Sequence, residues 1–341
     1  MGRLLQLLFD RTYRLLIGKK GQSQGIEITD SLRIQFDIEK TTKKDPNKST
    51  IKVYNLGKTS RAEIEKPDTR VVLYAGYIEE GGPILIFKGG VDYAWSKKDG
   101  ADIITEFELG DGSQEIRDTT ISVGYGKGIK STQVLNDVSK KMGLPLTLPS
   151  NAPERSWNNG LSYYGPARTL LDKVVQGTGL EWSIQNGNLQ VIEKGMVTTR
   201  QGILISQDSG LVGSPERERL SNAHTHKQDK GKKETGPPIV EPDYDGWRVK
   251  TLLMPSLNPG DRIKLEAQYV NGVYRIEEIK HNGDYDASGE WQSELKVVDP
   301  KKPIDEKKSS KGGKATRDKP EHHTGYNLDD LVDAYKDEGF A

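Results

Sequence analysis

The chain of 341 residues contains no cysteine, which excludes disulfide bonds, thiolate nucleophiles and cysteine-ligated metals. Hydrophobic residues are also scarce, at 33% of the chain, whereas ordinary globular domains are about 45 to 50% apolar with glycine counted. No hydrophobic run approaches the roughly 18 residues of a membrane span, so we expect none. Since 37 residues are glycine, the composition predicts turn-rich β structure together with disordered segments.

An excess of charge of either sign is missing as well. The 50 basic and 50 acidic residues cancel, so no overall field draws the chain to nucleic acid, and we expect no sequence-specific nucleic-acid binding. Of five histidines, none has a second ligand at helical i, i+4 spacing with a carboxylate beside it, and His281 is expected at an exposed turn. Gly124–Gly128 lacks the ending of a phosphate-binding loop. The sequence predicts no catalytic, cofactor-binding or metal-binding residue, and hence no enzyme.

One stretch of the chain repeats another. Arg262–Tyr269 aligns with Arg70–Tyr77, and Arg, Leu, Ala and Tyr coincide. A glycine-containing turn, an alternating apolar run, a Gly/Asp-rich loop and a further strand follow in both copies, closing with residues 102–109 and 290–298. Period-two alternation bounded by turn residues is typical of half-buried antiparallel strands. We interpret the repeat as a duplicated three-strand meander; the alternative is that any two antiparallel meanders look alike.

The repeat makes a specific structural prediction. Leu73 and Leu265 should occupy equivalent core positions, and so should Tyr77 and Tyr269. Both copies should superpose as small β-barrels, since about six strands are enough to close one.

Helical periodicity separates the two copies. Apolar residues at 3.6 spacing predict helices over 131–142, with Ser131 as N-cap, and over 166–176, with Pro166 in the first turn. Asn186–Asn188 has the composition of a tight hairpin turn. This part of the chain therefore predicts a small α/β domain.

Two polar segments are expected to be mobile, and a short helix follows the second. The segment 214–246 is rich in charge and proline, and 299–325 is a basic linker. The pattern of residues 326–341 predicts an amphipathic helix, with a favourable N-cap residue at its start and a glycine at its end. A helix this short needs a groove to be stable, so we predict partner docking through its apolar stripe, Leu328, Leu331, Val332 and Tyr335.

The predicted fold class is α+β, mainly β, with two related antiparallel β-barrel domains of tube type, a small α/β domain inserted between them and a flexible C-terminal tail. The expected divisions are an N-terminal segment 1–19, a first barrel 20–112, the α/β domain 113–195, a second barrel 196–298 with the mobile loop 214–246, the linker 299–325 and the helix 326–341.

A set of short motifs resembles one protein family. The succession is Arg33–Ile38, Asn47-x-x-x-Ile-x-Val-x-Asn-Leu56, Ala75-Gly-Tyr77, Phe87-x-Gly89, Asp111-Gly112, Gly210-Leu-Val-Gly-x-Pro215, Leu252–Gly260, Asn271–Tyr274 and His281–Asp284. In order and spacing it is similar to the two tube domains of baseplate hub proteins of contractile-tailed bacteriophages, over about residues 12 to 298. The 214–246 loop and the tail after Pro300 depart from the pattern.

The resemblance implies a virion structural protein of the tail baseplate, assembled in the bacterial host cytoplasm. It implies a homotrimer whose six barrels form a symmetry adaptor between the hexameric tail tube and the trimeric central spike, around a lumen for DNA ejection. Other baseplate proteins would bind the C-terminal tail. The alternatives are a tail-associated cell-wall or polysaccharide hydrolase and a carbohydrate-binding β module.

Overall fold

The computed structural model describes residues 10–19, 25–66, 68–198, 200–220, 244–286 and 288–300. Within these ranges the chain is mainly β, as predicted, and most strand pairs are antiparallel. No helix in the described ranges has both the length and the apolar character of a membrane span. Strands dominate because most segments alternate polar and apolar residues rather than following a helical period.

The first part of the main sheet comes from the N-terminal third of the chain. Its strands follow the order β3-β4-β7-β6-β5-β1-β2, with a short helix after β4. Strict alternation in β3 sends Ile34, Phe36 and Ile38 to the buried face. The elements are β1 Arg11–Lys19, β2 Gly25–Thr29, β3 Ile34–Thr41, β4 Asn47–Tyr54, α2 Lys58–Ile64, β5 Thr69–Tyr77, a 3₁₀ turn Ile78–Glu80, β6 Gly82–Asp99 and β7 Asp102–Asp111.

Helices and small sheets follow. The α4 helix has the predicted bounds, and the hairpin turn at Asn186 and Gly187 has positive φ at both residues, as a tight turn requires. The elements are α3 Ser113–Asp118, β8 Thr120–Tyr125, β9 Ile129–Lys130, α4 Ser131–Met142, β10 Leu146–Thr147, β11 Ser156–Trp157, β12 Leu161–Pro166, α5 Ala167–Val175, β13 Leu180–Gln185 and β14 Asn188–Glu193. The sheets are β10-β14-β13, β11-β9 and β12-β8.

The last part of the chain rejoins the main sheet. Its strand path is β16-β17-β20-β19-β18-β15, and β15 pairs with β18 in parallel. Both copies of the repeat are therefore antiparallel meanders, β5-β6-β7 and β18-β19-β20. The elements are β15 Ile203–Ile205, a 3₁₀ turn Gln207–Ser209, β16 Leu211–Leu220, β17 Tyr244–Leu252, β18 Arg262–Glu266, β19 Asn271–Asp284 and β20 Trp291–Val298.

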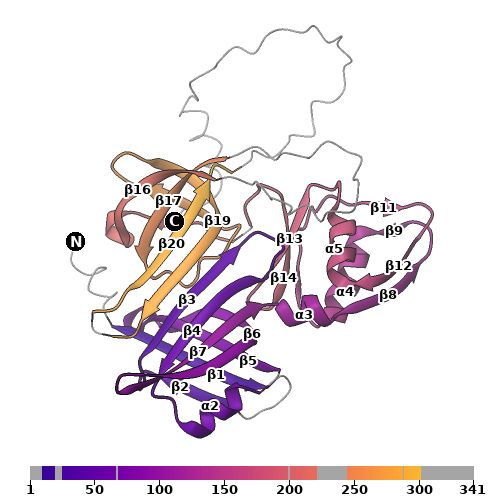
Figure 1. The fold of residues 1–341 in the computed structure, drawn as a ribbon. Coiled ribbons are helices and arrows are strands. Elements are labelled where there is room, and N and C mark those ends of the chain that lie inside the picture. The colour runs from indigo at the N-terminus through magenta and orange to yellow at the C-terminus, as the bar shows by residue number, and fades with distance from the viewer. Residues whose placement is uncertain are drawn as a thin grey trace, which may run out of the picture. The chain divides into compact units, whose positions relative to one another are not determined.

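A single strand pair joins the two parts into one 13-stranded sheet. β3 pairs antiparallel with β19, so strands more than 200 residues apart in the chain lie side by side (Figure 1). The pairings among the described strands do not close either part into a barrel, because the path ends at β2 and at β16.

Three hydrophobic clusters of buried residues lie along the chain. One gathers the N-terminal strands, one the helices with β13 and β14, and one the second meander. The first cluster also takes in Leu253 and Trp291 from the C-terminal part, and the Trp291 ring packs edge-on against Phe36 at 5.1 Å. Gly283 allows this packing, because a Cβ there would lie 2.1 Å from Cζ of Phe36.

Several detailed expectations were wrong. Leu73 and Leu265 are both fully buried, but Tyr77 is 1% exposed whereas Tyr269 is 82% exposed, because β18 ends at Glu266 before reaching it. The N-cap of α4 is Lys130, while Ser131 Oγ instead accepts a hydrogen bond from the Arg155 backbone.

Other boundaries shifted too. Pro166 is the N-cap of α5 rather than its first residue. The expected loop 214–246 is strand at both ends, in β16 and β17, and 221–243 lies outside the described residues. Residues 11–19, which the expected divisions assign to the N-terminal segment, form β1 and pair with β5.

Candidate assembly surface

The seam, which we define as the pairing of β3 with β19, connects the two related parts of the sheet. Seven residue pairs run from Thr41 opposite Glu278 to Gln35 opposite Asp284. Because neighbouring residues of a strand point to opposite faces, the seam has a buried inner side and a polar outer side.

Cross-strand ion pairs cover the outer side of the seam and the neighbouring strands. Each pair joins a cation and a carboxylate on adjacent strands: Lys280 with Asp37 at 2.8 Å, Lys296 with Glu278 at 2.9 Å, Arg248 with Glu218 at 2.9 Å and Lys52 with Glu106 at 3.7 Å. Exposed pairs of this kind contribute about 0 to 1 kcal/mol each, so they do little for stability. Their consequence is electrostatic: the face is strongly polar, yet its charges are largely neutralised in pairs.

Asp284 at the end of the seam shows the same local neutralisation. Arg33 donates to both of its carboxylate oxygens, at 2.9 and 2.7 Å, and Gln35 donates at 2.8 Å. Partial burial would raise the pKa of Asp284, but these hydrogen bonds lower it below its usual value. The carboxylate therefore stays ionised while its charge is compensated.

A groove of about 360 Å³ lies over the outer side of the seam. Gln35, Asp37, Lys52 and Asn282 are among the residues that line it. Small-molecule sites are usually lined mainly by apolar and aromatic side chains. This lining, shared by both related parts of the sheet, fits a solvated surface better than a ligand pocket.

On the inner side of the seam, His281 is fully buried rather than exposed at a turn as predicted. The expectation was wrong because β19 continues through His281 to Asp284 and pairs with β3 there. Nδ1 of His281 lies 2.8 Å from Ser293 Oγ. Burial, and secondarily the nearby Lys40 cation, lower the pKa of His281 well below its usual value, so it is neutral at physiological pH.

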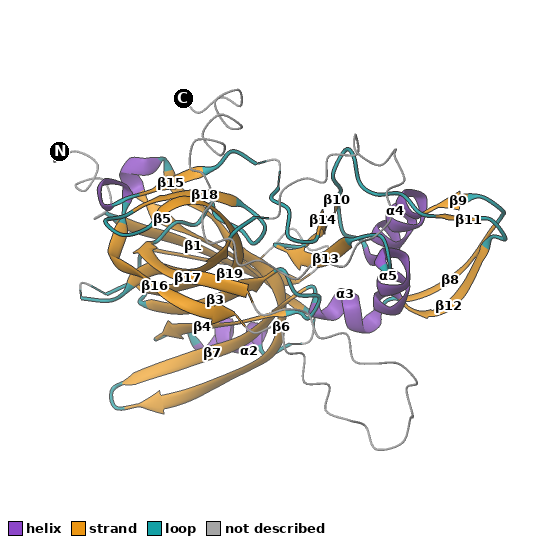
Figure 2. Ribbon diagram, turned by 90° about the horizontal axis from the view of Figure 1, so that it is seen from above, coloured by secondary structure: helices purple, strands orange, loops and turns teal. Residues whose placement is uncertain are grey.

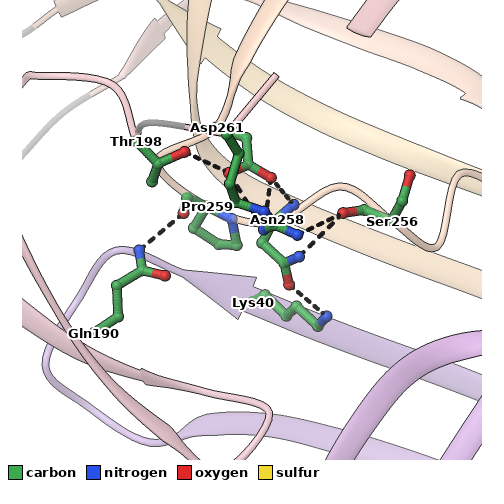
Figure 3. A network of polar contacts seen from close by, with 8 residues as sticks. Lys40, Gln190, Thr198, Ser256, Asn258, Pro259 and Asp261 are labelled. Atoms are coloured by element: carbon green, nitrogen blue, oxygen red, sulfur yellow. Dashed lines mark hydrogen bonds and ion pairs between the residues drawn. The ribbon is translucent and has the colours of Figure 1, made fainter. Parts of the chain in front are cut away.

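Lys40 lies at one end of a buried polar network whose hydrogen bonds converge on Asn258 and Asp261, on the inner side of the seam (Figure 3). Its Nζ donates to Asn258 Oδ1 at 3.0 Å, and the Asn258 backbone N–H donates to Asp261 at 2.9 Å. Thr198 Oγ1 also donates to Asp261, at 2.7 Å, and Gln190 Nε2 donates to the Pro259 carbonyl at 3.2 Å. The network links β3 and β14 to the loop before β18.

Asp111 is a buried carboxylate that attracts the Lys40 cation electrostatically. It accepts hydrogen bonds from the backbone N–H groups of Asn186 and Gly187 in the β13–β14 turn. Burial raises the pKa of Asp111 to about 7, and burial lowers the pKa of Lys40 to about 8. The cation and the carboxylate attract each other, but desolvation outweighs that attraction for both.

Further buried polar contacts join the same regions. Asn47 Nδ2 donates to the Ile184 carbonyl at 3.2 Å, and Gln185 Nε2 donates to the Thr41 carbonyl at 2.7 Å. Arg275, 1% exposed, forms an ion pair with Glu181 of β13. Since buried polar groups need partners in defined geometry, these contacts fix how β13 and β14 meet the main sheet. These contacts could not be predicted from the sequence, because nothing in the local pattern marks Lys40, Asp111 or Arg275 as buried.

The predicted docking site lies in a part of the chain that the structure does not describe. Leu328, Leu331, Val332 and Tyr335 lie outside the described residues, as do residues 301–341 as a whole. In the described part of the chain, no three His, Asp or Glu side chains gather as a metal site would require. Of the tryptophans, Trp182 and Trp291 are core residues, while Trp95 lies beside the exposed Tyr93 with 5.2 Å between ring centroids.

The fold resembles solved structures of tail proteins. A 43 kDa tail protein of prophage MuSo2 from Shewanella oneidensis matches with a TM-score of 0.57 at 13% identity, covering 84% of this chain and 98% of the other. The fold is that of phage tail proteins. A tail protein from Neisseria meningitidis matches with a TM-score of 0.55 at 10% identity, covering 84% and 96%.

A third similar structure is a component of a bacterial secretion system. An Escherichia coli component of the type VI secretion system, described as structurally similar to the T4 tail proteins gp27 and gp5, has a TM-score of 0.52 at 9% identity, covering 84% of this chain and 77% of the other. No family model and no curated protein matches the sequence. What this chain shares with these proteins is therefore the fold.

Proposed function

We propose that this tail-fold protein is the baseplate hub of a phage tail. In this role it is a non-enzymatic homotrimer that forms a ring of pseudo-six-fold symmetry and joins a hexameric tail tube to a trimeric central spike. The protein is located in the baseplate of the virion, and it is assembled in the cytoplasm of the bacterial host. Other baseplate proteins bind its C-terminal tail through Leu328, Leu331, Val332 and Tyr335.

The observation that carries the proposal is the presence of two related strand paths in one chain. β4-β7-β6-β5 in the N-terminal part and β17-β20-β19-β18 in the C-terminal part have the same order. Closed rings repeat one interface, so a three-fold object can match a six-fold tube only if each subunit offers two equivalent units. The seam supplies one such contact inside each chain. Each half of the chain then corresponds to one tube-type barrel, completed in the ring rather than in the monomer.

The outer side of the seam suits the wall of a DNA-conducting lumen. Basic surfaces hold phosphates and release counterions, which makes DNA bind. Here Lys280, Lys296 and Arg248 are each paired with a carboxylate on a neighbouring strand. A wall of this kind is wet and polar but presents little unpaired positive charge, so it lets DNA pass.

The test is the mass of the full chain in solution, alone and with purified tail tube protein from the same phage. We expect a trimer, in one or both conditions, and a complex with three hub subunits per tube ring of six. A monomer or dimer that persists with the tube protein would refute the ring. Lysis zones on peptidoglycan gels would instead support the hydrolase alternative, and glycan binding dependent on Tyr93 and Trp95 would support the carbohydrate-binding alternative.

A further inference from the structure

Among the strand edges without a partner in the described part of the chain, those of β16 and of the outer half of β6 occupy corresponding places in the two related strand paths. β16 pairs with β17 on one side and with no described strand on the other. β6 loses β5 after Gly90, so its outer half, residues 91–99, pairs with β7 alone. Figure 2 shows this β6–β7 hairpin extending away from the neighbouring strands. Unpaired edges are templates for strand addition from another chain.

The duplicated structure assigns an equivalent to the free half of β6. A β-bulge interrupts the β6–β7 pairing between Val91 and Tyr93, and the same irregularity interrupts β19–β20 between Ile276 and Glu278. Bulges are specific features of a strand, so they align the two strands residue by residue. Tyr93 thus corresponds to Glu278, where the seam with β3 begins. The free half of β6 is the counterpart of the half of β19 that β3 covers.

The free edge of β16 is likewise the counterpart of β3. A row of directly opposite residues crosses the N-terminal part of the sheet from Asp37 of β3 through Thr50 and Glu108 to Tyr93 of β6. The corresponding row in the C-terminal part runs from Glu216 through Arg248 and Lys296 to Glu278. Glu216 therefore occupies the place of Asp37, and Glu218 the place of Glu39.

These edges carry opposite charges, as the strands of the seam do, but the cation is shifted by two residues along the strand. In the seam, Lys280 lies opposite Glu39 and forms an ion pair with Asp37 on the same face. β16 offers Glu216 and Glu218 at the equivalent positions, and β6 carries the exposed Lys97 on the matching face, two residues beyond the counterpart of Lys280. Opposite charges on facing strands stabilise a register, and Glu216 of β16 with Lys97 of β6 supplies such a pair, while Glu218 remains paired with Arg248 of its own sheet.

We propose that β16 of one chain adds antiparallel to the free half of β6 in a second copy, with Glu216 opposite Lys97 and Glu218 opposite Trp95. The contact repeats the seam between chains instead of within one chain. It rests on the proposed ring, and it identifies the surfaces that close it. Pro215 on β16 and the lysines at the tip of β6 are features that keep free edges from pairing indiscriminately.

Because the natural chain has no cysteine, disulfide trapping tests the register directly. Residues directly opposite on antiparallel strands have Cα atoms about 4.5 to 5.5 Å apart, which lies within the range that a disulfide spans. The full chain carrying Lys97→Cys and Glu216→Cys should form covalent dimers and trimers on a non-reducing gel after mild oxidation. The matched control, Lys98→Cys with Glu216→Cys, should not, since residue 98 points to the other face of β6.

Two further arms separate the possible outcomes. Asn282→Cys with Asp37→Cys, the equivalent pair in the seam, should close within one chain and shows that the oxidation works. Lys97→Glu and Glu216→Lys should each weaken self-association, and the two together should restore it. A trimer by mass with no trapping at 97 and 216, or equal trapping at 98 and 216, would overturn the β16–β6 contact and leave the hub proposal standing. Absence of both the trimer and the cross-link would overturn both.

Discussion

The two related parts of the main sheet share their strand order but not their surroundings. β5-β6-β7 and β18-β19-β20 have the same pairing and the same bulge position. Yet β5 is flanked by the antiparallel β1, whereas β18 is flanked by the short parallel β15. The two parts thus have the same backbone pairing and bulge, but different flanking strands and exposed side chains.

The difference is most informative at the end of the second meander. Trp291 follows the same register as Ile103 of the first meander, since Gly283 lies opposite Trp291 and Lys98 lies opposite Ile103. Ile103 is half-buried, but Trp291 is 2% exposed and belongs to the N-terminal hydrophobic cluster. Trp291 of the C-terminal part thus packs in the hydrophobic cluster of the N-terminal part. It can do so because the seam places β19 beside β3.

Trp291→Ala is the change expected to have the largest effect. It removes a buried ring that packs on Phe36, and such truncations cost about 3 to 5 kcal/mol of unfolding free energy. Equilibrium denaturant unfolding of the full chain measures the cost. The matched Ile103→Ala variant should lose only about 1 kcal/mol, because its side chain is already partly exposed. A loss of only about 1 kcal/mol at both positions would show that the N-terminal core does not depend on Trp291.

Lys40 provides the next test, through the pH dependence of stability. Burial lowers its folded-state pKa to about 8 from 10.5. The unfolded chain then binds the proton more tightly, so the unfolding free energy rises as the pH increases from about 8 towards 10.5. Asp111 and Asp261 raise this pKa and Arg200 lowers it, but desolvation is the largest cause.

In Lys40→Met the rise should disappear. Between pH 8 and 9.5 the wild type should gain about 2 kcal/mol relative to the variant, because one pKa unit corresponds to about 1.4 kcal/mol. Chemical denaturation at both pH values measures the unfolding free energy of each protein. Subtracting the variant's value from the wild type's removes the contribution of the titratable groups that both share. Parallel pH profiles would show that Lys40 titrates normally and that the network in Figure 3 is open to solvent.

Sequence reasoning found what local patterns encode. The alternation of Ile34, Phe36 and Ile38 placed β3, and the 3.6 spacing gave α4 with its observed bounds. It could not find the seam, because nothing in β3 or β19 alone indicates a partner more than 200 residues away. For the same reason His281 was expected at a turn, and the burial of Lys40 could not be predicted, because the burial of both residues depends on the pairing of β3 with β19.

The smallest expected effect separates Tyr77 from Tyr269, the two residues that the repeat aligns. Tyr77 Oη accepts a hydrogen bond from the Leu253 backbone N–H at 3.1 Å, inside the N-terminal cluster. Tyr77→Phe should cost about 1 kcal/mol of unfolding free energy, since it deletes one buried hydrogen bond and keeps the ring. The cost is moderate because the same N–H also donates to the Trp291 carbonyl. Tyr269→Phe should change stability by less than about 0.5 kcal/mol, because the Tyr269 side chain is 82% exposed. Thermal and denaturant unfolding of both variants measures the pair, and a loss of about 1 kcal/mol at both positions would show that Tyr269 is buried after all, by its own chain or by a second copy.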